Sequence, residues 1–233
     1  MEALFTQQSA KNHDLAPQKT TVLPIYTLAW DDAASLGRDL TEQFIHQRFQ
    51  QHYGASIIDF MPNLLAAKNE ASITAALGFQ LAQKQQSLFL EQYLDVTIES
   101  ALSVITGSPI NRAGIVEIGN LASARQRATQ TLFLLLAEIL HQSGFEWVVF
   151  TANRSVKNWL EKLTIATVSL GEANASKLSN KSVNWGSYYD DKPVVLAANI
   201  QQGCSNLNQH PLMDALRQNY RQQIGRAVAA LRL

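Results

Sequence analysis

The sequence predicts a mixed α/β (α+β) protein with a central sheet, and two observations support this fold class. Strand-like residues 113–122, an apolar helix over about 129–142 and strand-like residues 145–152 follow one another with short connections. That order is typical of a crossover between two parallel strands. The 233 residues, 46% of them hydrophobic and 16% charged, can bury a sizeable core in one domain with elaborations.

Composition narrows the classes of function. The 19 Lys and Arg residues balance the 19 Asp and Glu residues, so no global charge attracts nucleic acid or an anionic membrane. Cys204 is the single cysteine, which excludes an intrachain disulfide and indicates a reducing compartment. The N-terminal residues are polar and no apolar run could span a bilayer, so we expect a soluble, cytoplasmic protein. The histidines lack metal-ligand spacing, and we expect no metal site.

Three regions are expected along the chain. Residues 1–21 would form a flexible N-terminal arm, and residues 22–205 the folded domain. Residues 206–233 would form an amphipathic helix, starting at about residue 209, that packs on the domain through one apolar stripe. The stripe comprises Leu212, Leu216, Tyr220, Ile224, Val228 and Leu231.

The domain begins with a predicted strand over residues 22–30, which a proline interrupts. Asp31 and Asp32 then offer an N-cap for a helix that runs to about Tyr53 and stops at Gly54. The expected apolar face of this helix comprises Leu36, Leu40, Phe44, Ile45 and Phe49.

Between this helix and the crossover, residues 56–61 and 73–79 predict the two strands of a hairpin. Periodicity fits residues 87–94 to a strand or to a helix, and both stay open. Residues 97–106 predict a short helix that Gly107 ends. The elements expected after the crossover are a helix over 155–163 and strands over 165–170 and 193–200.

A polar turn, from Ser123 to Ala128, connects the first crossover strand to its helix. Unpaired amides at the start of a helix point at one place and favour an anion there. Arg125 and Arg127 add positive charge that suits phosphate groups. We interpret the turn as a pyrophosphate site, and a plain loop with solvated arginines is the alternative.

The order of strand, Arg-Gln-Arg-Ala turn, helix LFLLLAEILHQSG, strand WVVFTAN and helix NRSVKNWLEKL resembles the core of the GNAT acyltransferase superfamily. In that pattern an asparagine precedes a helix that bears an aromatic-leucine pair, and Asn153, Val156, Trp159 and Leu160 occupy these places. The turn itself departs from the pattern because it holds no glycine, which permits the closest backbone approach to phosphate.

Longer phrases resemble the thermostable hemolysin family over most of the chain, at 53–66, 76–82, 87–99, 111–123, 146–153 and 185–200. That family is similar in fold to GNAT enzymes and to acyl-homoserine-lactone synthases. The resemblance implies a mixed, mostly antiparallel sheet with helices on both faces and a V-shaped opening between two parallel strands. In the synthases one strand carries a glutamate, a small residue and an arginine. Glu117, Gly119 and Asn120 stand in these places here, with Asn120 replacing the arginine.

The resemblance implies an N-acyltransferase that moves a long-chain fatty acyl group from acyl-CoA or acyl carrier protein to an amino acid or small amine. The amine would attack the thioester directly, and Glu117 would accept its proton, directly or through water. Burial would raise the pKa of Glu117 into a useful range. Pairing of Glu117 with Arg112 or Arg125, or exposure to water, is the structural alternative.

Further roles follow from the same resemblance, each with ordinary packing or solvation as the alternative. Tyr93 would protonate the departing thiolate or bind the acceptor, and Glu91 would hold the acceptor's amine. Amides around Leu121 to Ser123 would polarise the thioester carbonyl. Carrier contacts are expected at Leu121, Ala122, Ser123, Arg125, Gln126, Arg127, Ala128, Thr129, Asn153 and Arg154. Acceptor or acyl contacts are expected at Asp59, Phe60, Asn120, Trp147 and Phe150.

Two other functions remain open. A membrane-active hemolysin is favoured by Arg217, Arg221 and Arg226 beside the last apolar stripe, since a basic amphipathic helix can lie at a lipid interface. Asp214 dilutes that face, so we prefer packing on the core and at most peripheral membrane contact. The chain could also be an inactive acyl-binding module. An acylated amine made by the enzyme would itself be a surfactant and would connect haemolysis with acyl transfer.

Overall fold

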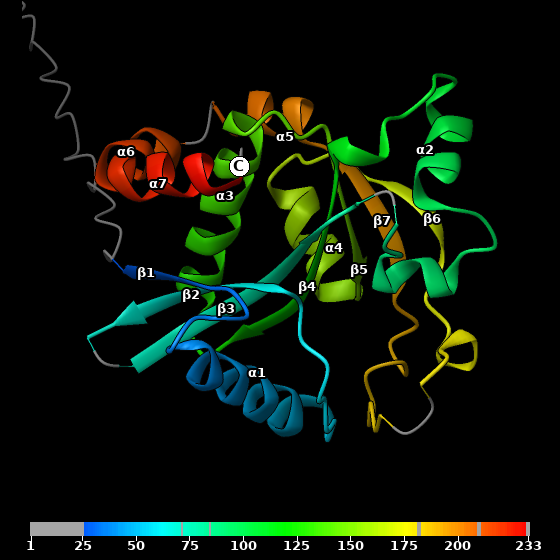
Figure 1. Cartoon of the computed structure of the whole chain (residues 1–233), viewed down its shortest axis with the longest axis horizontal. Coiled ribbons are helices and arrows are strands. Elements are labelled where there is room, and N and C mark those ends of the chain that lie inside the picture. The colour runs from blue at the N-terminus through cyan, green and yellow to red at the C-terminus, as the bar shows by residue number, and fades with distance from the viewer. Residues whose placement is uncertain (1–25, 71, 84, 181–182, 209–210, 232–233) are drawn as a thin grey trace, which may run out of the picture.

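In the computed structural model, which describes residues 26–70, 72–83, 85–180, 183–208 and 211–231, the chain folds around a seven-stranded sheet (Figure 1). The strands lie in the order β1-β2-β3-β4-β5-β7-β6. Neighbouring strands are antiparallel except β4 and β5, which are parallel. The predicted mixed, mostly antiparallel sheet is confirmed. The strands are β1 (Thr27–Asp31), β2 (Asn63–Asn69), β3 (Ser72–Leu81), β4 (Ile115–Ser123), β5 (Trp147–Ala152), β6 (Val168–Glu172) and β7 (Val194–Asn199).

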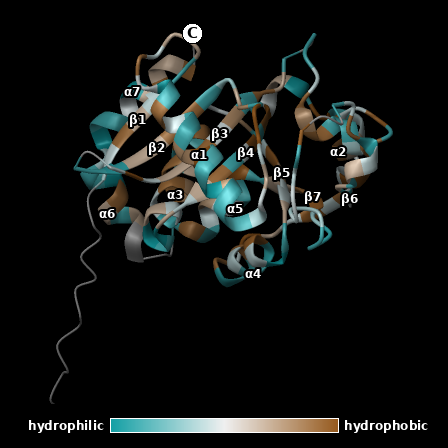
Figure 2. Cartoon of the chain, turned by 90° about the horizontal axis from the view of Figure 1, so that it is seen from below, coloured by the Kyte–Doolittle hydropathy of each residue, from teal (hydrophilic) through white to brown (hydrophobic). Residues whose placement is uncertain are grey.

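Helices cover both faces of the sheet, with α1 on one face and α3 on the other (Figure 1). Figure 2 shows hydrophobic residues along the strands that these helices cover. A short 3-10 helix, η1 (Phe89–Tyr93), follows β3. The α-helices are α1 (Arg38–Tyr53), α2 (Ile98–Thr106), α3 (Gln126–Gln142), α4 (Arg154–Lys162), α5 (Ile200–Leu207), α6 (Pro211–Asn219) and α7 (Arg221–Leu231).

Side chains alternate between the two faces along β4. Val116 and Ile118 enter the large core cluster that includes the apolar residues of α3. Ile115 points to the other face and packs with η1 and α2. Since side chains of a strand alternate, Glu117 lies on the same face as Ile115. The carboxylate thus lies opposite α3, beside η1.

The predicted crossover is confirmed, with β4 and β5 parallel and joined through α3. The two strands pair only from Ile115 and Trp147 to Ile118 and Phe150, after which β4 continues without β5. Asn120 has a φ of 50° where the register of β3 and β4 shifts. Such a bulge bends a strand and increases its twist, which favours its departure from the neighbour. The expected opening between two parallel strands is present.

The predicted start of α1 is wrong. The helix begins at Arg38, because Asp31 and Asp32 are engaged elsewhere: Thr41 donates to Asp31 at 2.7 Å, and Asp32 accepts from the amide of Ala34 at 3.0 Å. Gly54 ends the helix in the left-handed conformation, as predicted. Leu36 and Leu40 are exposed, whereas Ile45 and Phe49 are buried, so only the C-terminal half of the expected face packs.

The predicted hairpin had its first strand in the wrong place. Residues 56–61 form no strand of the sheet, and β2 begins at Asn63 and pairs with β3 through the turn around Glu70. The run from Leu64 to Ala67 is buried on both faces, so it lacks the alternation that marks a half-exposed strand. The open segment 87–94 forms η1, and α2 and its stop at Gly107 lie as predicted.

The C-terminal region contains two helices, α6 and α7, in place of the one expected from about residue 209, and the unpredicted α5 precedes them. Within the described part of the chain, α5, α6 and α7 follow β7, and Tyr220 separates α6 from α7. The stripe residues Leu216, Tyr220, Ile224 and Val228 are nonetheless buried in the core cluster against α3, so the stripe does pack. The expected arm over residues 1–21 lies outside the described residues.

Tyr220 ties the C-terminal helices to the start of the sheet, because its hydroxyl accepts a hydrogen bond from the amide of Tyr26 at 2.7 Å. Both residues are buried. We expect Tyr220→Phe to lower the free energy of unfolding by about 1–3 kcal/mol, since it leaves a buried amide without a partner. Urea unfolding followed by circular dichroism would measure this loss. An unchanged midpoint would show that the hydroxyl contributes nothing.

Candidate active site

Glu117 is the buried acid of β4, with only 3% of its surface exposed. The amides of Phe89 and Leu90 in η1 donate to its two carboxylate oxygens at 2.8 and 3.1 Å. Burial raises its pKa to about 8, although these amides act to lower it, and the charge of Glu91 adds to the rise. Glu117 is therefore a far stronger base than an ordinary carboxylate. It does not pair with Arg112 as the structural alternative supposed, because Arg112 binds Glu91 and Glu99.

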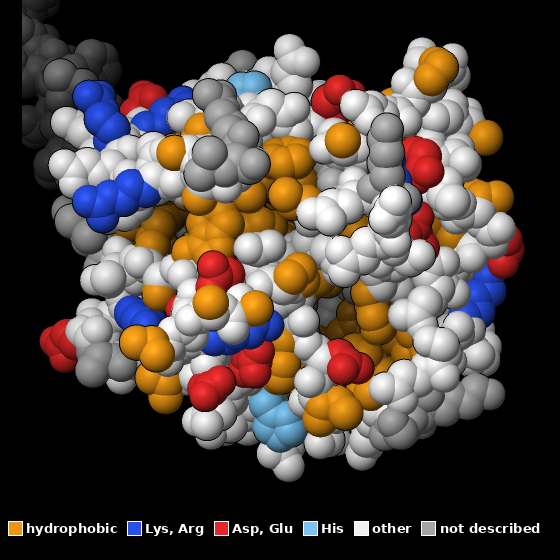
Figure 3. Space-filling view, viewed as in Figure 1, with side chains coloured by type: hydrophobic (Ala, Val, Ile, Leu, Met, Phe, Trp, Pro, Cys, Tyr) orange, Lys and Arg blue, Asp and Glu red, His pale blue; other side chains and the backbone are white. Residues whose placement is uncertain are grey.

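A cavity of about 180 Å³ opens in front of Glu117. Figure 3 shows a hollow with hydrophobic walls to the right of α1, where this cavity lies. Asp59, Phe60, Tyr93 and Asn120 line it, which agrees with the expected placement of these four residues near Glu117. Its aromatic walls are Phe49, Phe60, Phe89, Tyr93, Trp185 and Tyr188. An apolar cavity with one buried base suits a reaction from which water is excluded.

One wall of this cavity depends on two glycines. A side chain at Gly119 would come within 2.5 Å of the end of Met61, and one at Gly78 within 2.6 Å of its Cβ. The amide of Met61 also donates to the side chain of Asn120 at 2.8 Å. The requirement for glycine is strict at Gly78, where Met61 Cβ is in the way, whereas at Gly119 the flexible end of the Met61 side chain could move aside. Sequence reasoning missed Met61 and Gly78, although both stand in phrases that carried the resemblance.

A second wall comes from the segment between β6 and β7. Tyr189 and Tyr93 share a hydrogen bond between their hydroxyls at 2.6 Å, and Tyr188 shares one with Thr151 at 3.1 Å. Burial raises the pKa of Tyr93 and raises that of Tyr188 to about 12, so both are neutral donors at physiological pH. Trp185 completes this wall. Nothing local in the sequence indicated that Trp185 and Tyr188 line the cavity in front of Glu117.

A larger cavity of about 510 Å³ lies where β4 and β5 part, between α1 and the N-terminal turns of α3 and α4. Seven of the ten expected carrier contacts line it: Leu121, Ala122, Ser123, Arg125, Gln126, Thr129 and Asn153. Arg127, Ala128 and Arg154 do not. Ala128 is buried in the core, and Arg127 and Arg154 are exposed outside this lining. The turn therefore presents one of its two arginines to the cavity.

Polar groups in the larger cavity have capacity for a ligand. Thr129 Oγ1 and Trp159 Nε1 are buried and have no hydrogen-bond partner within the described residues. Arg48 donates to the carbonyl oxygen of Ser123 at 2.7 Å, and Asn153 caps α4 through the amide of Val156 at 3.0 Å. Both unpaired atoms are covered by protein, so a ligand in the cavity would instead meet exposed side chains of its lining, among them Arg125 and Gln126. The residues thus fit a ligand such as a phosphopantetheine carrier.

β4 connects the two cavities. Glu117 to Asn120 line the smaller one, and Leu121 to Ser123 line the larger one. Phe49 of α1 lines both. The two cavities therefore lie next to each other along β4, with Phe49 between them.

Three expected contacts lie elsewhere. Phe150 is buried beneath α3, because neighbouring residues of β5 point to opposite faces. Trp147 packs with η1 and α2 and lines neither cavity. The two oxygens of Glu91 accept hydrogen bonds from Arg112 and from the amides of Leu88 and Ile98, so they are not free for a substrate amine. Burial alone would raise the pKa of Glu91, but these bonds lower it.

In the part of the chain that the structure describes, no helix is long and apolar enough to cross a membrane. No group of three or more His, Cys, Asp or Glu residues within that part could hold a metal ion.

Solved structures share this fold. FeeM, an N-acyl amino acid synthase from uncultured soil microbes, has a TM-score of 0.54 and 11% identity, covering 82% of this chain and 98% of FeeM. BjaI, a CoA-dependent acyl-homoserine lactone synthase, has a TM-score of 0.51 and 14% identity, covering 88% of this chain and 98% of BjaI. At such identities the likeness establishes the fold alone, which is that of GNAT-like acyltransferases.

Sequence comparison is more specific about the family. None of the curated protein sequences compared with the chain matches it. The family model described as thermostable hemolysin matches residues 32–204, well over half of the chain and including β4, α3, β5 and both cavities' main walls. The chain therefore belongs to the thermostable hemolysin family.

Proposed function

We propose that the chain is an N-acyltransferase that moves a long-chain fatty acyl group from a thioester of coenzyme A or acyl carrier protein to an amine. The observation that carries the proposal is Glu117, a buried base that lines the aromatic cavity and stands on the strand whose next residues line the larger cavity. Acyl transfer to nitrogen needs a base at this point, because the attacking amine must lose a proton. The names of FeeM and BjaI, which share the fold, agree with this chemistry.

The reaction assigned to the site is a direct displacement. The amine nitrogen attacks the carbonyl carbon of the thioester, the new C–N bond forms, and the C–S bond breaks to release a thiolate. Glu117 accepts one proton from the nitrogen. A backbone amide near Leu121 to Ser123 would polarise the carbonyl oxygen. Asp59 and the aromatic walls would attract a cationic amine, which would give its first proton to water so that the neutral nitrogen attacks and Glu117 takes the second.

Tyr93 is assigned to acceptor binding. A group that protonates a thiolate should have a pKa near that of the thiol, which is about 8.5 in the free side chain of cysteine. Burial raises the pKa of Tyr93 well above its ordinary value, so its proton is held too tightly for that transfer. Its neutral hydroxyl, paired with Tyr189, can still donate or accept a hydrogen bond.

Replacement of Glu117 tests the proposal. We expect Glu117→Gln to lower kcat/KM for acyl-CoA and an amine by about 10²–10⁴-fold, because general-base catalysis is lost while the side chain keeps its shape. Release of free thiol would report the rate, with Glu146→Gln as a control carboxylate outside both cavities. Full activity in the Glu117→Gln enzyme would exclude Glu117 as the base.

The pH dependence should follow the same group. Glu117 is protonated below its pKa of about 8, so kcat/KM should rise with pH and level off above that value. The free energy of unfolding should instead fall as pH rises. Because the folded pKa exceeds the ordinary value of 4.5, the wild type should lose stability relative to Glu117→Gln as pH rises from about 4.5 to 8. Parallel stability curves for the two proteins would contradict the raised pKa.

The two arginines of the turn provide a matched pair for the carrier site. Arg125 lines the larger cavity and Arg127 does not. We expect Arg125→Ala to raise KM for acyl-CoA about tenfold, which corresponds to about 1.4 kcal/mol, and Arg127→Ala to change it less than about twofold. Steady-state kinetics at one low salt concentration would measure both, since salt screens such contacts. Equal effects of the two changes would place the phosphates outside this cavity.

The family name connects to this chemistry through the product. A long-chain N-acyl amine is an amphiphile and would lyse red cells without a pore formed by the protein. Mass spectrometry of lipids from cells that express the chain should reveal a new acylated amine that is missing with Glu117→Gln. Haemolysis should follow the lipid fraction. Lysis by purified, lipid-free protein that is unaffected by Glu117→Gln would instead support a membrane-active protein.

A further inference from the structure

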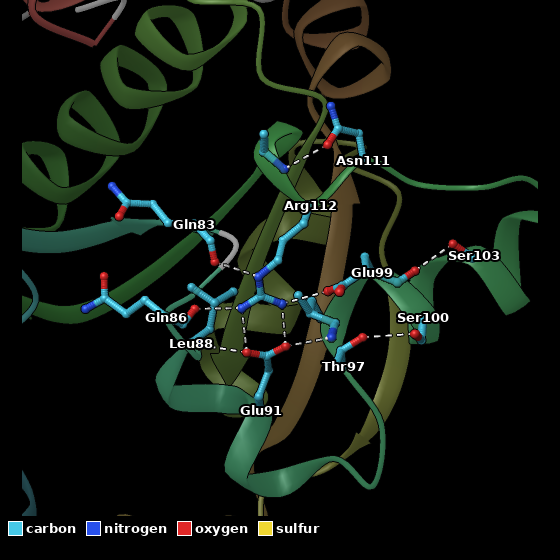
Figure 4. Close-up of polar contacts among 12 residues, drawn as sticks. Gln83, Gln86, Leu88, Glu91, Thr97, Glu99, Ser100, Ser103, Asn111 and Arg112 are labelled. Atoms are coloured by element: carbon cyan, nitrogen blue, oxygen red, sulfur yellow. Dashed lines mark hydrogen bonds and ion pairs between the residues drawn. The ribbon is translucent and has the colours of Figure 1, made fainter.

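Arg112 is the centre of the densest polar network around η1 (Figure 4). A guanidinium has five N–H donors. Those of Arg112 reach Glu91 at 2.7 and 2.8 Å, Glu99 at 2.6 Å, and the carbonyl oxygens of Gln83 at 3.0 Å and Gln86 at 2.9 Å. Each donor thus has one acceptor. Side chains of Arg112 and Glu91 are only 12% and 11% exposed, so this fork is well shielded from water.

Glu91 extends the network into the backbone. Besides the fork with Arg112, its oxygens accept from the amide of Leu88 at 2.7 Å and from that of Ile98 at 2.8 Å. The bond from Leu88 caps the N-terminal end of η1. The bond from Ile98 fixes the first residue of α2. The position of η1 is therefore set by Glu91, and that of Glu91 by Arg112.

The network leads to Glu117 by two routes. Through η1, the amides of Phe89 and Leu90 hold its carboxylate. Through the backbone, Arg112 lies in the short turn that leads directly into β4, the strand that carries Glu117. The contacts thus form a closed ring from Arg112 through Glu91 and η1 to Glu117 and back along β4.

We propose that Arg112 and Glu91 are positioning residues for Glu117, because their ion pair holds the turn whose amides orient the carboxylate and keeps the nearby charge of Glu91 neutralised. The inference rests on the proposed function for the role of Glu117 as base. Its central measurement, the titration of Glu117, requires no turnover.

The charged and titratable groups around Glu117 define what each change should do. η1 contributes Glu91 and Tyr93, the segment after α1 contributes Asp59, and the segment before β7 contributes Tyr188. From β3 the residue paired with Glu117 is Gln80, which carries no charge. Loss of the Arg112 charge would leave Glu91 as an unpaired anion and loosen the two amides, and both effects favour protonated Glu117. Glu91→Gln would leave the Arg112 charge in excess, which favours the carboxylate, while the amide oxygen of Gln can still accept from the backbone and limits the loosening of η1.

The test is to titrate Glu117 in the full chain by carboxyl ¹³C NMR, with the signal assigned by its absence in Glu117→Gln. We expect Arg112→Met to raise the midpoint by about one pH unit and Glu91→Gln to lower it by a similar amount. Arg112→Lys, which keeps the charge but loses the fork, should raise the midpoint by less than Arg112→Met, because only the loosened amides then act. Arg217→Met is the matched control, since Arg217 pairs with the buried Glu138 at 2.8 Å away from both cavities. It should destabilise the fold without moving the midpoint.

Activity supplies the second readout. We expect Arg112→Met and Glu91→Gln to lower kcat about 10–100-fold with little change in KM, and to cause no further loss when Glu117 is already Gln. Unmoved midpoints in the folded variants, or equal losses in the Glu117→Gln background, would overturn the positioning role. Should Arg112→Met not fold, Glu91→Gln alone decides between the outcomes. A wild type that titrates as expected but transfers no acyl group would refute the proposed function and leave the positioning role intact.

Discussion

The parting of β4 from β5 is the constraint on which the rest of the site depends. The strands pair only as far as Ile118 and Phe150, and the bulge at Asn120 turns β4 away. Beyond these residues the backbone groups of β4 and β5 that would pair in a continuous sheet do not bond to each other. The larger cavity occupies this space, and the N-terminal turns of α3 and α4 border it. The gap between the parallel strands thus provides the space in which the proposed carrier would bind, beside the cavity that Glu117 lines.

Glu117 shows how a carboxylate can be kept in an apolar place. Burial among aromatic rings disfavours its charge, while the amides of Phe89 and Leu90 partly compensate. These opposing effects bring the pKa of Glu117 to about 8, close to neutral pH, where a base can both accept and return a proton. This arrangement requires that η1, which supplies the two donating amides, is held in place. Arg112 and Glu91 provide that rigidity from outside the cavity.

Much of the fold could be predicted, because its signals are local. The crossover through α3, the left-handed stop at Gly54 and the short helix α2 each follow from a few neighbouring residues. The errors arose where distant contacts decide. β2 is covered on both faces and shows no alternation, and α1 begins late because Asp31 is bound by Thr41. The single helix expected from about residue 209 is two helices, α6 and α7, which both pack against α3.

For the site, the sequence by itself determined that Glu117 and the turn with Arg125 lie on and after one strand, β4. Both follow from residue types in one continuous stretch and from the family resemblance. Only the tertiary structure decided which groups meet them. The aromatic wall around Trp185, the true partner of Arg112 and the inward face of Phe150 depend on segments far apart in the chain. Their meeting is fixed by packing and strand register, which no local pattern encodes.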